Sequence, residues 1–144
     1  MSLTGVYDPA NIFARILRGE APAAKVFEDD VALAFMDVFP QTRGHTLVIP
    51  KAGTARNFLD FPPEAVGPYM ARVQLVALAV EKALKPDGVM IMQLNGAPAG
   101  QTVFHLHVHI LPRWDGETMK GHGKAGMAQV ADLQTLAAQI AAAL

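Results

Sequence analysis

Short runs of apolar and β-branched residues, each bounded by Gly, Pro or Asp, predict five β-strands along this chain. Residues 24–38, AKVFEDDVALAFMDV, contain two such runs around a pair of aspartates, which predicts a hairpin. A third strand, GHTLVIPK, is expected to stop at Pro50, because proline cannot donate to a sheet. The fourth and fifth strands are expected in VMIMQLN (89–95) and VFHLHVHIL (103–111).

Helical periodicity first occurs near the N-terminus. In DPANIFARILRGEAP, we expect Asp8 to cap a helix, Pro9 to occupy its first position and Gly19 to end it. Ile12, Phe13, Ile16 and Leu17 have the spacing of one apolar helix face.

The longest helix is expected within residues 61–88. Proline is tolerated only in the first turn of a helix, so Pro68 predicts that the ordered helix begins near Gly67. Its apolar stripe comprises Val66, Met70, Val73, Ala77, Val80 and Leu84. The alanine-rich residues 127–144 predict a last helix, after a glycine-rich surface loop that contains His122.

Five strands with short connections favour antiparallel pairing, and together with three helices they predict the α+β class. The chain has 144 residues, which suits a single domain, and it contains no internal repeat. Hydrophobic residues make up 51% of it and charged residues 17%, which argues against disorder.

Charge and cysteine content narrow the function classes. A net charge of −1 gives no basis for general nucleic-acid or membrane-surface binding. The absence of cysteine excludes disulfides, thiolate metal sites and cysteine nucleophiles. No apolar stretch is long enough to span a bilayer. We therefore expect a cytoplasmic protein that binds neither nucleic acid nor membrane.

Three of the five histidines occupy alternate positions of the fifth strand: His105, His107 and His109. Side chains alternate between the faces of a strand, so the three imidazoles should share one face, about 6.5–7 Å apart. The intervening apolar residues should enter the core. Such a row suits a bound polyanion, and it also suits a metal, since catalytic zinc often has three protein ligands and a water.

The loop before this strand, NGAPAGQT (95–102), is rich in small residues. Gly100, Gln101 and Thr102 could offer backbone N–H groups and a hydroxyl to an anion, and glycine permits close approach of the backbone. A glycine loop leading into a histidine row predicts a phosphate site beside a nucleophile.

The pattern His-apolar-His-apolar-His-apolar-apolar, preceded by LNGAPAGQTVFH, resembles the histidine triad (HIT) family of nucleotide hydrolases and transferases. Residues 27–51, FEDDVALAFMDVFPQTRGHTLVIPK, are similar to the N-terminal half of that family. Residues 11–30 resemble its purine nucleoside phosphoramidase branch. The resemblance covers about residues 10–113. It implies a single HIT domain over 1–144, with a loop and a C-terminal helix in 114–144, and a homodimer whose two sheets join into one.

The resemblance also implies roles for the histidines. His107 corresponds to the nucleophile that takes the nucleoside monophosphate. His109 and His45 correspond to the flanking histidines that contact the phosphate, and His105 to the one that orients the nucleophile.

The remaining site positions are likewise implied by the resemblance. The contacts to phosphate and leaving group fall on Asn95, Gly100, Gln101 and Thr102. The nucleoside-binding positions are Ile12, Phe13, Ile16, Phe35, Asp37 and Val38, where the Asp37 carboxylate would hold the ribose hydroxyls. Neither a cofactor nor a metal is implied. Trp114 receives no role from the sequence.

These residues favour a hydrolase that releases a nucleoside monophosphate, AMP, from a phosphoramidate or mixed anhydride. A histidine near its ordinary pKa is largely neutral at pH 7, so a ring nitrogen can attack phosphorus and form a phosphohistidine. Three alternatives stay open. Thr102 within GQTV resembles a branch that hydrolyses diadenosine polyphosphates; the chain could be a non-catalytic nucleotide-binding protein; or it could be a metalloenzyme.

Overall fold

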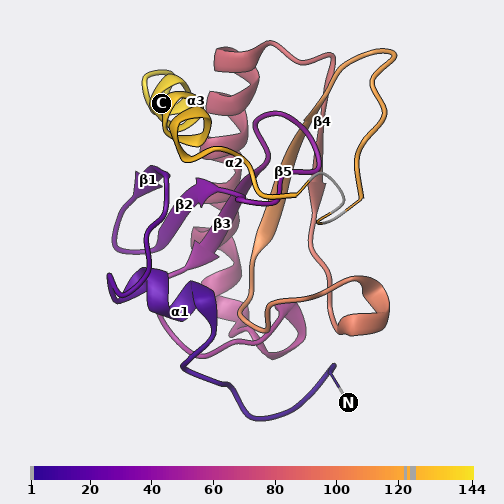
Figure 1. Cartoon of the computed structure of the whole chain (residues 1–144). Helices are drawn as coiled ribbons and strands as arrows, with labels where there is room; N and C mark the ends of the chain where they lie inside the picture. The colour runs from indigo at the N-terminus through magenta and orange to yellow at the C-terminus, as the bar shows by residue number, and fades with distance from the viewer. Residues whose placement is uncertain (1, 122, 124–125) are drawn as a thin grey trace.

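The computed structural model describes residues 2–121, 123 and 126–144, and its centre is a five-stranded sheet (Figure 1). The strands lie in the order β1 (Lys25–Glu28), β2 (Ala32–Met36), β3 (Thr46–Pro50), β5 (Val108–Arg113) and β4 (Gly88–Met92). All neighbouring pairs are antiparallel. The predicted hairpin, the five strands and the α+β class are therefore confirmed.

Helices cover both faces of the sheet. On one face, α1 (Ile12–Leu17) packs Phe13 and Ile16 against alternate residues of β2 and β3. On the other face, α2 (Pro63–Leu84) and α3 (Val130–Ala141) enclose the larger core with β2, β3 and β5 (Figure 1). Two short 3-10 helices, Phe58–Asp60 and Ala97–Ala99, lie in loops. Within the part of the chain that the structure describes, no helix is long and apolar enough to cross a membrane.

The first helix starts later than Asp8 and Pro9 predict. Its N-cap is Asn11, whose Oδ1 accepts the N–H of Ala14 at 2.9 Å. Asp8 instead accepts the N–H of Ala10 in a turn just before the helix. A second capping residue three positions downstream thus displaces the expected start, while Gly19 follows the helix in the predicted left-handed conformation (φ +75°).

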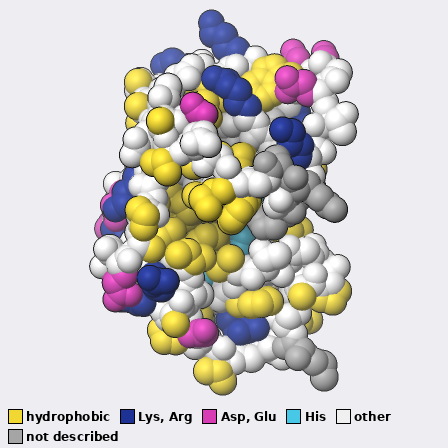
Figure 2. All heavy atoms as spheres, in the orientation of Figure 1, with side chains coloured by type: hydrophobic (Ala, Val, Ile, Leu, Met, Phe, Trp, Pro, Cys, Tyr) yellow, Lys and Arg dark blue, Asp and Glu magenta, His cyan; other side chains and the backbone are white. Residues whose placement is uncertain are grey.

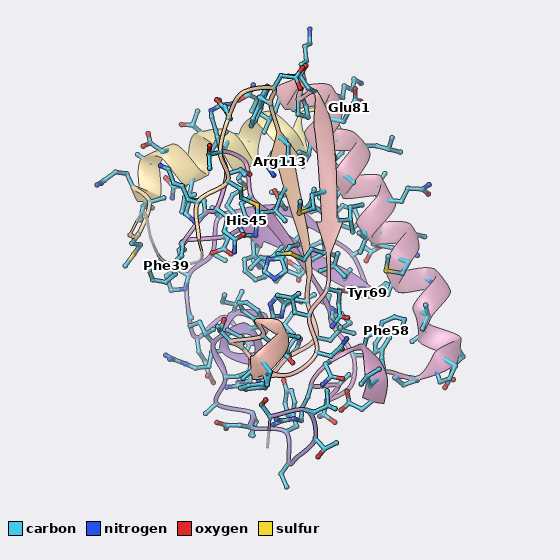
Figure 3. The ribbon with its side chains drawn as sticks, turned by 90° about the vertical axis from the view of Figure 1, so that its right-hand side faces the viewer. Phe39, His45, Phe58, Tyr69, Glu81 and Arg113 are labelled. Atoms are coloured by element: carbon cyan, nitrogen blue, oxygen red, sulfur yellow. The ribbon has the colours of Figure 1, made fainter. Side chains whose placement is uncertain are left out.

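The long helix starts earlier than predicted, at Pro63, so Pro68 lies inside it. Pro68 has no N–H to donate to the carbonyl of Glu64, so α2 lacks one backbone hydrogen bond there. The cost in helix stability is small because Glu64 is a solvent-exposed residue of the first turn. The buried face also differs from the predicted stripe. Tyr69 and Val76 are fully buried, whereas Met70 is exposed. Figure 3 shows Tyr69 between α2 and the sheet, where its O–H donates to the carbonyl of Val48.

The fifth strand begins at Val108, later than predicted, but the predicted alternation extends back beyond it. Leu106, Val108 and Ile110 are buried in the α2 core. Before Val108 the backbone is held by a loop instead of a strand, since the N–H of Leu106 donates to the carbonyl of Ala55 at 3.0 Å.

The segment after β5 runs beside the loop that follows β2. The N–H groups of Lys120 and Ala128 donate to the carbonyls of Gln41 and Val38, respectively. Trp114 is partly buried against the α2 core. His122, expected at the surface, lies outside the described residues.

Gly44 and Gly19 allow a matched test of how tightly the chain is packed just before β3. Both have positive φ, but a Cβ at Gly44 would collide with the Leu84 side chain, whereas Gly19 has open space. Strain alone should make Gly19→Ala lose about 1 kcal/mol of unfolding free energy. We expect Gly44→Ala to lose about 1–3 kcal/mol more from overpacking, measured by urea denaturation. Equal losses would show that Leu84 moves aside freely.

Candidate active site

A pocket of about 360 Å³ opens on the α1 face of the sheet. Figure 2 shows apolar side chains gathered at the centre of this face, with a histidine beside them. The lining includes ten of the predicted site residues: Ile12, Phe13, Ile16, Phe35, Asp37, Val38, Gly100, Thr102, His107 and His109. Most of the wall is therefore apolar, and the polar groups converge at the histidines.

His107 is held in one orientation by its own backbone neighbour. Its Nδ1 lies 2.7 Å from the carbonyl oxygen of His105. A carbonyl can only accept, so Nδ1 carries the hydrogen and Nε2 carries the lone pair. The ring is also packed edge-on between Phe13 and His109, with centroids 4.9 Å from each. The geometry thus holds the Nε2 lone pair of His107 at a fixed place in the pocket wall.

His105 lies behind His107 and does not line the pocket. Its Nε2 faces the carbonyl of Pro50 at 3.4 Å, and its Nδ1 lies 2.7 Å from the hydroxyl of Tyr7. Since a carbonyl accepts, Nε2 carries the hydrogen and Nδ1 accepts from Tyr7. Burial lowers the pKa of His105 to about 4, so this imidazole is neutral at pH 7.

His45 and His109 form a second chain of hydrogen bonds. The N–H of Gln41 donates to Nδ1 of the fully buried His45 at 3.1 Å, so Nε2 of His45 carries the hydrogen when the ring is neutral. That Nε2 lies 2.9 Å from Nδ1 of His109. His109 then accepts at Nδ1 and carries its own hydrogen at Nε2. The chain gives His109 a hydrogen-bond donor for a phosphate oxygen or leaving group.

Asp37 is buried at the edge of the pocket, directly after β2. Its Oδ1 accepts the N–H of Phe39 at 2.8 Å, and its Oδ2 lies 3.5 Å from Nε2 of His45. Among the residues that the structure describes, Asp37, His45 and His109 form a group that could hold a metal, since one donor atom from each lies within 4.8 Å of the others. One carboxylate and two imidazoles form a donor set that zinc accepts, although zinc would have to displace the hydrogen shared by the two rings.

Comparison with known proteins agrees with this geometry. The HIT domain family matches residues 18–116. The chain belongs to the HIT domain family. Members of this family are nucleotide-binding hydrolases and transferases, the class expected from the histidine row.

Relatives match the HIT chain over most of its length. It is 40% identical to "Protein hit" of Bacillus subtilis over 135 residues, 90% of this chain and 91% of the relative. It is 38% identical to "Adenylylsulfatase HINT3" of Arabidopsis thaliana over 117 residues, which cover 77% of this chain and 59% of that longer relative.

Solved structures match as well. A "Hit-like protein involved in cell-cycle regulation" from Bartonella henselae superposes with a TM-score of 0.89 at 46% identity, over 96% of this chain and 100% of that one. A zinc-bound histidine triad family protein from Mycobacterium smegmatis gives 0.80 at 37% identity, over 93% and 92%. The HIT fold expected from the sequence is therefore confirmed.

The loop before the HIT histidines differs from the expected anion cradle. The N–H groups of Gly100 and Gln101 donate within the loop, to the carbonyls of Ala97 and Gly96, respectively. The Gln101 side chain also supports the loop, since its amide donates to the carbonyl of Arg56 at 2.7 Å. Of the residues expected at the phosphate, Gly100 and Thr102 therefore line the pocket, whereas Gln101 braces the loop behind it.

Asn95 is also directed away from the pocket. Its Oδ1 accepts the N–H of Phe58 at 2.9 Å and the side-chain amide of Gln93 at 3.0 Å. It joins the loop after β4 to the 3-10 helix before α2. A role for Asn95 at the phosphate stays a prediction, and the structure places it as a support.

Tyr7 and Gln41 are the site residues that sequence reasoning missed. Tyr7 reaches His105 from 98 positions away, within a strand-free N-terminal segment that has no periodic pattern. Gln41 acts through its backbone N–H, which any residue except proline could supply. The sequence around either residue therefore carried no sign of its role.

The Tyr7 hydroxyl should act as a positioning group for the HIT histidines. Tyr7→Phe removes the donor to His105, which leaves a buried ring nitrogen unsatisfied and lets the tautomers of His105 mix. We expect nucleotide turnover to fall about ten-fold, which corresponds to about 1.4 kcal/mol. We also expect the ¹⁵N chemical shifts of His105 to move toward those of a tautomer mixture.

Tyr69→Phe is the matched control. Tyr69 also makes a 2.7 Å hydrogen bond, but to the carbonyl of Val48 in the core on the other face of the sheet. This variant should lose stability while the His105 shifts and kcat stay unchanged. Equal losses of kcat in the two variants would show that Tyr7→Phe acts through general destabilisation and not through His105.

Proposed function

We propose that this HIT protein hydrolyses nucleoside 5′-phosphoramidates and mixed anhydrides and releases AMP. The observation that carries the proposal is the bond from Nδ1 of His107 to the carbonyl of His105. It leaves Nε2 with the lone pair, in a pocket wall beside a donor on His109. A nucleophile and a donor side by side are the minimum that a phosphorus displacement needs.

The proposed reaction has two displacements. Nε2 of His107 attacks the α-phosphorus, so a P–N bond forms to the ring while the bond to the leaving group breaks. The leaving amine takes a proton, which Nε2–H of His109 or the Thr102 hydroxyl can supply. Water then attacks the phosphohistidine and gives its proton to the group that protonated the leaving amine, which restores that group; the P–N bond to His107 breaks, and AMP is released. His107 returns to its starting tautomer because its Nδ1 hydrogen never leaves the His105 carbonyl.

The apolar wall supports a nucleoside as the group that is bound. Phe13 and Phe35 meet edge to face at 5.4 Å, and Ile12 and Val38 line the pocket beside them. A purine ring suits such a slot, and the Asp37 carboxylate suits ribose hydroxyls better than it suits phosphate. The name of the Arabidopsis relative, adenylylsulfatase, supports mixed anhydrides of AMP as substrates.

Diadenosine polyphosphates are the second candidate substrates. The observation that favours them is Thr102, which lines the pocket at the position where the leaving group is expected. Comparing kcat/KM on a phosphoramidate and on a diadenosine polyphosphate distinguishes the two candidates, since these substrates share the nucleoside and differ only in the leaving group. Tight AMP binding without turnover of either class would instead indicate a nucleotide-binding protein.

The first test follows AMP release from adenosine 5′-phosphoramidate and from a diadenosine polyphosphate, with a metal chelator present. We expect rapid release from the phosphoramidate. We expect His107→Ala to lower kcat by about 10³-fold or more while AMP binding persists, because the nucleophile is lost and the apolar pocket remains. Full activity in His107→Ala would exclude the phosphohistidine, and loss of activity on chelation would favour a metalloenzyme.

We further propose that the protein is a cytoplasmic homodimer that pairs through β4 and α2. β4 is an edge strand whose Ile91 is 48% exposed, and Leu78 of α2, which lines the same groove, is 60% exposed. An exposed apolar edge strand invites pairing with another chain. A second copy placed there would join the two sheets into one.

Leu78→Glu should convert a dimer to a monomer in sedimentation velocity, because it would bury a charge in the proposed interface. Val130→Glu is the control, since Val130 is 64% exposed but lies at the start of α3, away from β4. A wild-type monomer would contradict the proposal, as would a Leu78→Glu variant that sediments as the dimer.

A further inference from the structure

A second pocket, of about 400 Å³, lies between the loop before β3 and the segment that leaves β5. Seven of its eight lining residues have polar or charged side chains: Pro40, Gln41, Thr42, Arg43, Arg113, Glu117, Thr118 and Lys120. Only Gln41 belongs to the nucleotide pocket as well. Figure 3 shows Arg113 and His45 toward the same end of the sheet. The proposed hydrolysis uses none of the charged side chains in this second pocket.

Positive charge dominates this pocket. Arg43, Arg113 and Lys120 line it against a single carboxylate, that of Glu117. Over the described part of the chain, none of the three cations forms an ion pair, although Arg18, Lys25, Lys51 and Arg72 do. The chain as a whole has a net charge of −1, so three cations that form no ion pair around one pocket are a local excess of positive charge.

Hydrogen-bond donors in the pocket are also available for a ligand. The Thr42 hydroxyl is buried and has no hydrogen-bond partner among the described residues, which is uncommon for a buried polar group. The Arg113 guanidinium donates from Nη2 to the carbonyl of Glu117 at 3.1 Å, and its Nη1 has only a 4.0 Å contact with the sulfur of Met119. An arginine can offer two parallel donors to an oxyanion.

We propose that this pocket binds a phosphate or diphosphate group that is distinct from the phosphate attacked by His107. Arg43, Arg113 and Lys120 supply both the charge and the hydrogen-bond donors. The volume accommodates a diphosphate with its remaining water. Two sources share this chemistry: a free inorganic anion, and a second phosphate on the ribose of a nucleotide in the neighbouring pocket.

The main chain of Gln41 connects this anion pocket to the catalytic histidines. Its N–H donates to Nδ1 of His45, and its carbonyl accepts the N–H of Lys120 at 2.9 Å. An anion bound by Arg43 and Lys120 therefore restrains Gln41, and the N–H of Gln41 sets the tautomer of His45. Linkage makes the effect reciprocal, so an anion in one pocket should tighten nucleotide binding in the other several-fold.

The experiment is calorimetric titration of inorganic diphosphate into protein saturated with AMP, which keeps the anion away from the histidines. We expect one diphosphate per chain, bound more weakly as salt is raised. Arg113→Gln should weaken binding about ten-fold or more, because a hydrogen-bonded charge is lost. Arg43→Gln should weaken it several-fold. Lys82→Gln, which removes a charge from the last turn of α2, should leave it unchanged.

A second arm separates the two sources by comparing AMP with adenosine 3′,5′-bisphosphate. Tighter binding of the bisphosphate that is lost in Arg113→Gln identifies the anion as part of the nucleotide. Diphosphate binding to the AMP complex, without a bisphosphate advantage, identifies a free anion. If neither ligand depends on Arg113 and Arg43, the proposal is wrong. AMP release from a phosphoramidate is measured separately, so its failure would leave this result standing.

Discussion

The site depends on one hydrogen bond, from Nδ1 of His107 to the carbonyl oxygen of His105, at 2.7 Å. It is a bond between neighbours in sequence, so its geometry is set by the backbone between residues 105 and 107. That backbone is not part of a regular strand, and it cannot rely on a sheet ladder for its position. It is fixed instead by Leu106, whose side chain is fully buried and whose N–H donates to Ala55. Burial of such a side chain is worth about 1.5–3 kcal/mol. The core on one face of the sheet therefore orients the His107 imidazole on the other.

Apolar residues and histidines alternate along residues 105–110, so the two faces of this segment have different roles. Leu106, Val108 and Ile110 pack in the α2 core and stabilise the fold. The histidines on the opposite face are therefore not needed for core packing. Burying three imidazoles side by side is unfavourable unless their nitrogens are paired. Two separate hydrogen-bond chains meet this requirement, one from Tyr7 and one from Gln41. His107 is paired separately, with the carbonyl of His105. Backbone groups, which can only accept or only donate, fix the hydrogens of the neutral rings: the carbonyls of Pro50 and His105 on one side, and the N–H of Gln41 on the other.

The sequence predicted the features that follow from short-period patterns of apolar residues. It did not predict the features that depend on contacts between distant residues. The period-two pattern was enough to place His105, His107 and His109 on one face, opposite Leu106 and Val108. The helix starts were wrong because capping is decided locally by competing residues, as Asn11 and Asp8 show. The N–H groups of Gly100 and Gln101 were expected at an anion, but a 3-10 turn uses both of them. No pattern in the sequence could reveal Tyr7, since its partner lies 98 residues away.

The neutral state of His105 follows from its buried place behind His107. Burial lowers its pKa to about 4 from an ordinary value of 6.5; the Pro50 carbonyl opposes this shift, and the nearby His107 adds to it. Because the folded pKa is the lower one, the unfolded chain binds more protons between pH 6.5 and pH 4. His105 therefore contributes its full stability above pH 6.5 and loses that contribution as the pH falls toward 4. A charged His105 would carry a hydrogen on Nδ1 and could no longer accept from Tyr7. The same burial that keeps this ring neutral thus preserves both its bond to Tyr7 and the uncharged surroundings in which His107 can act as a nucleophile.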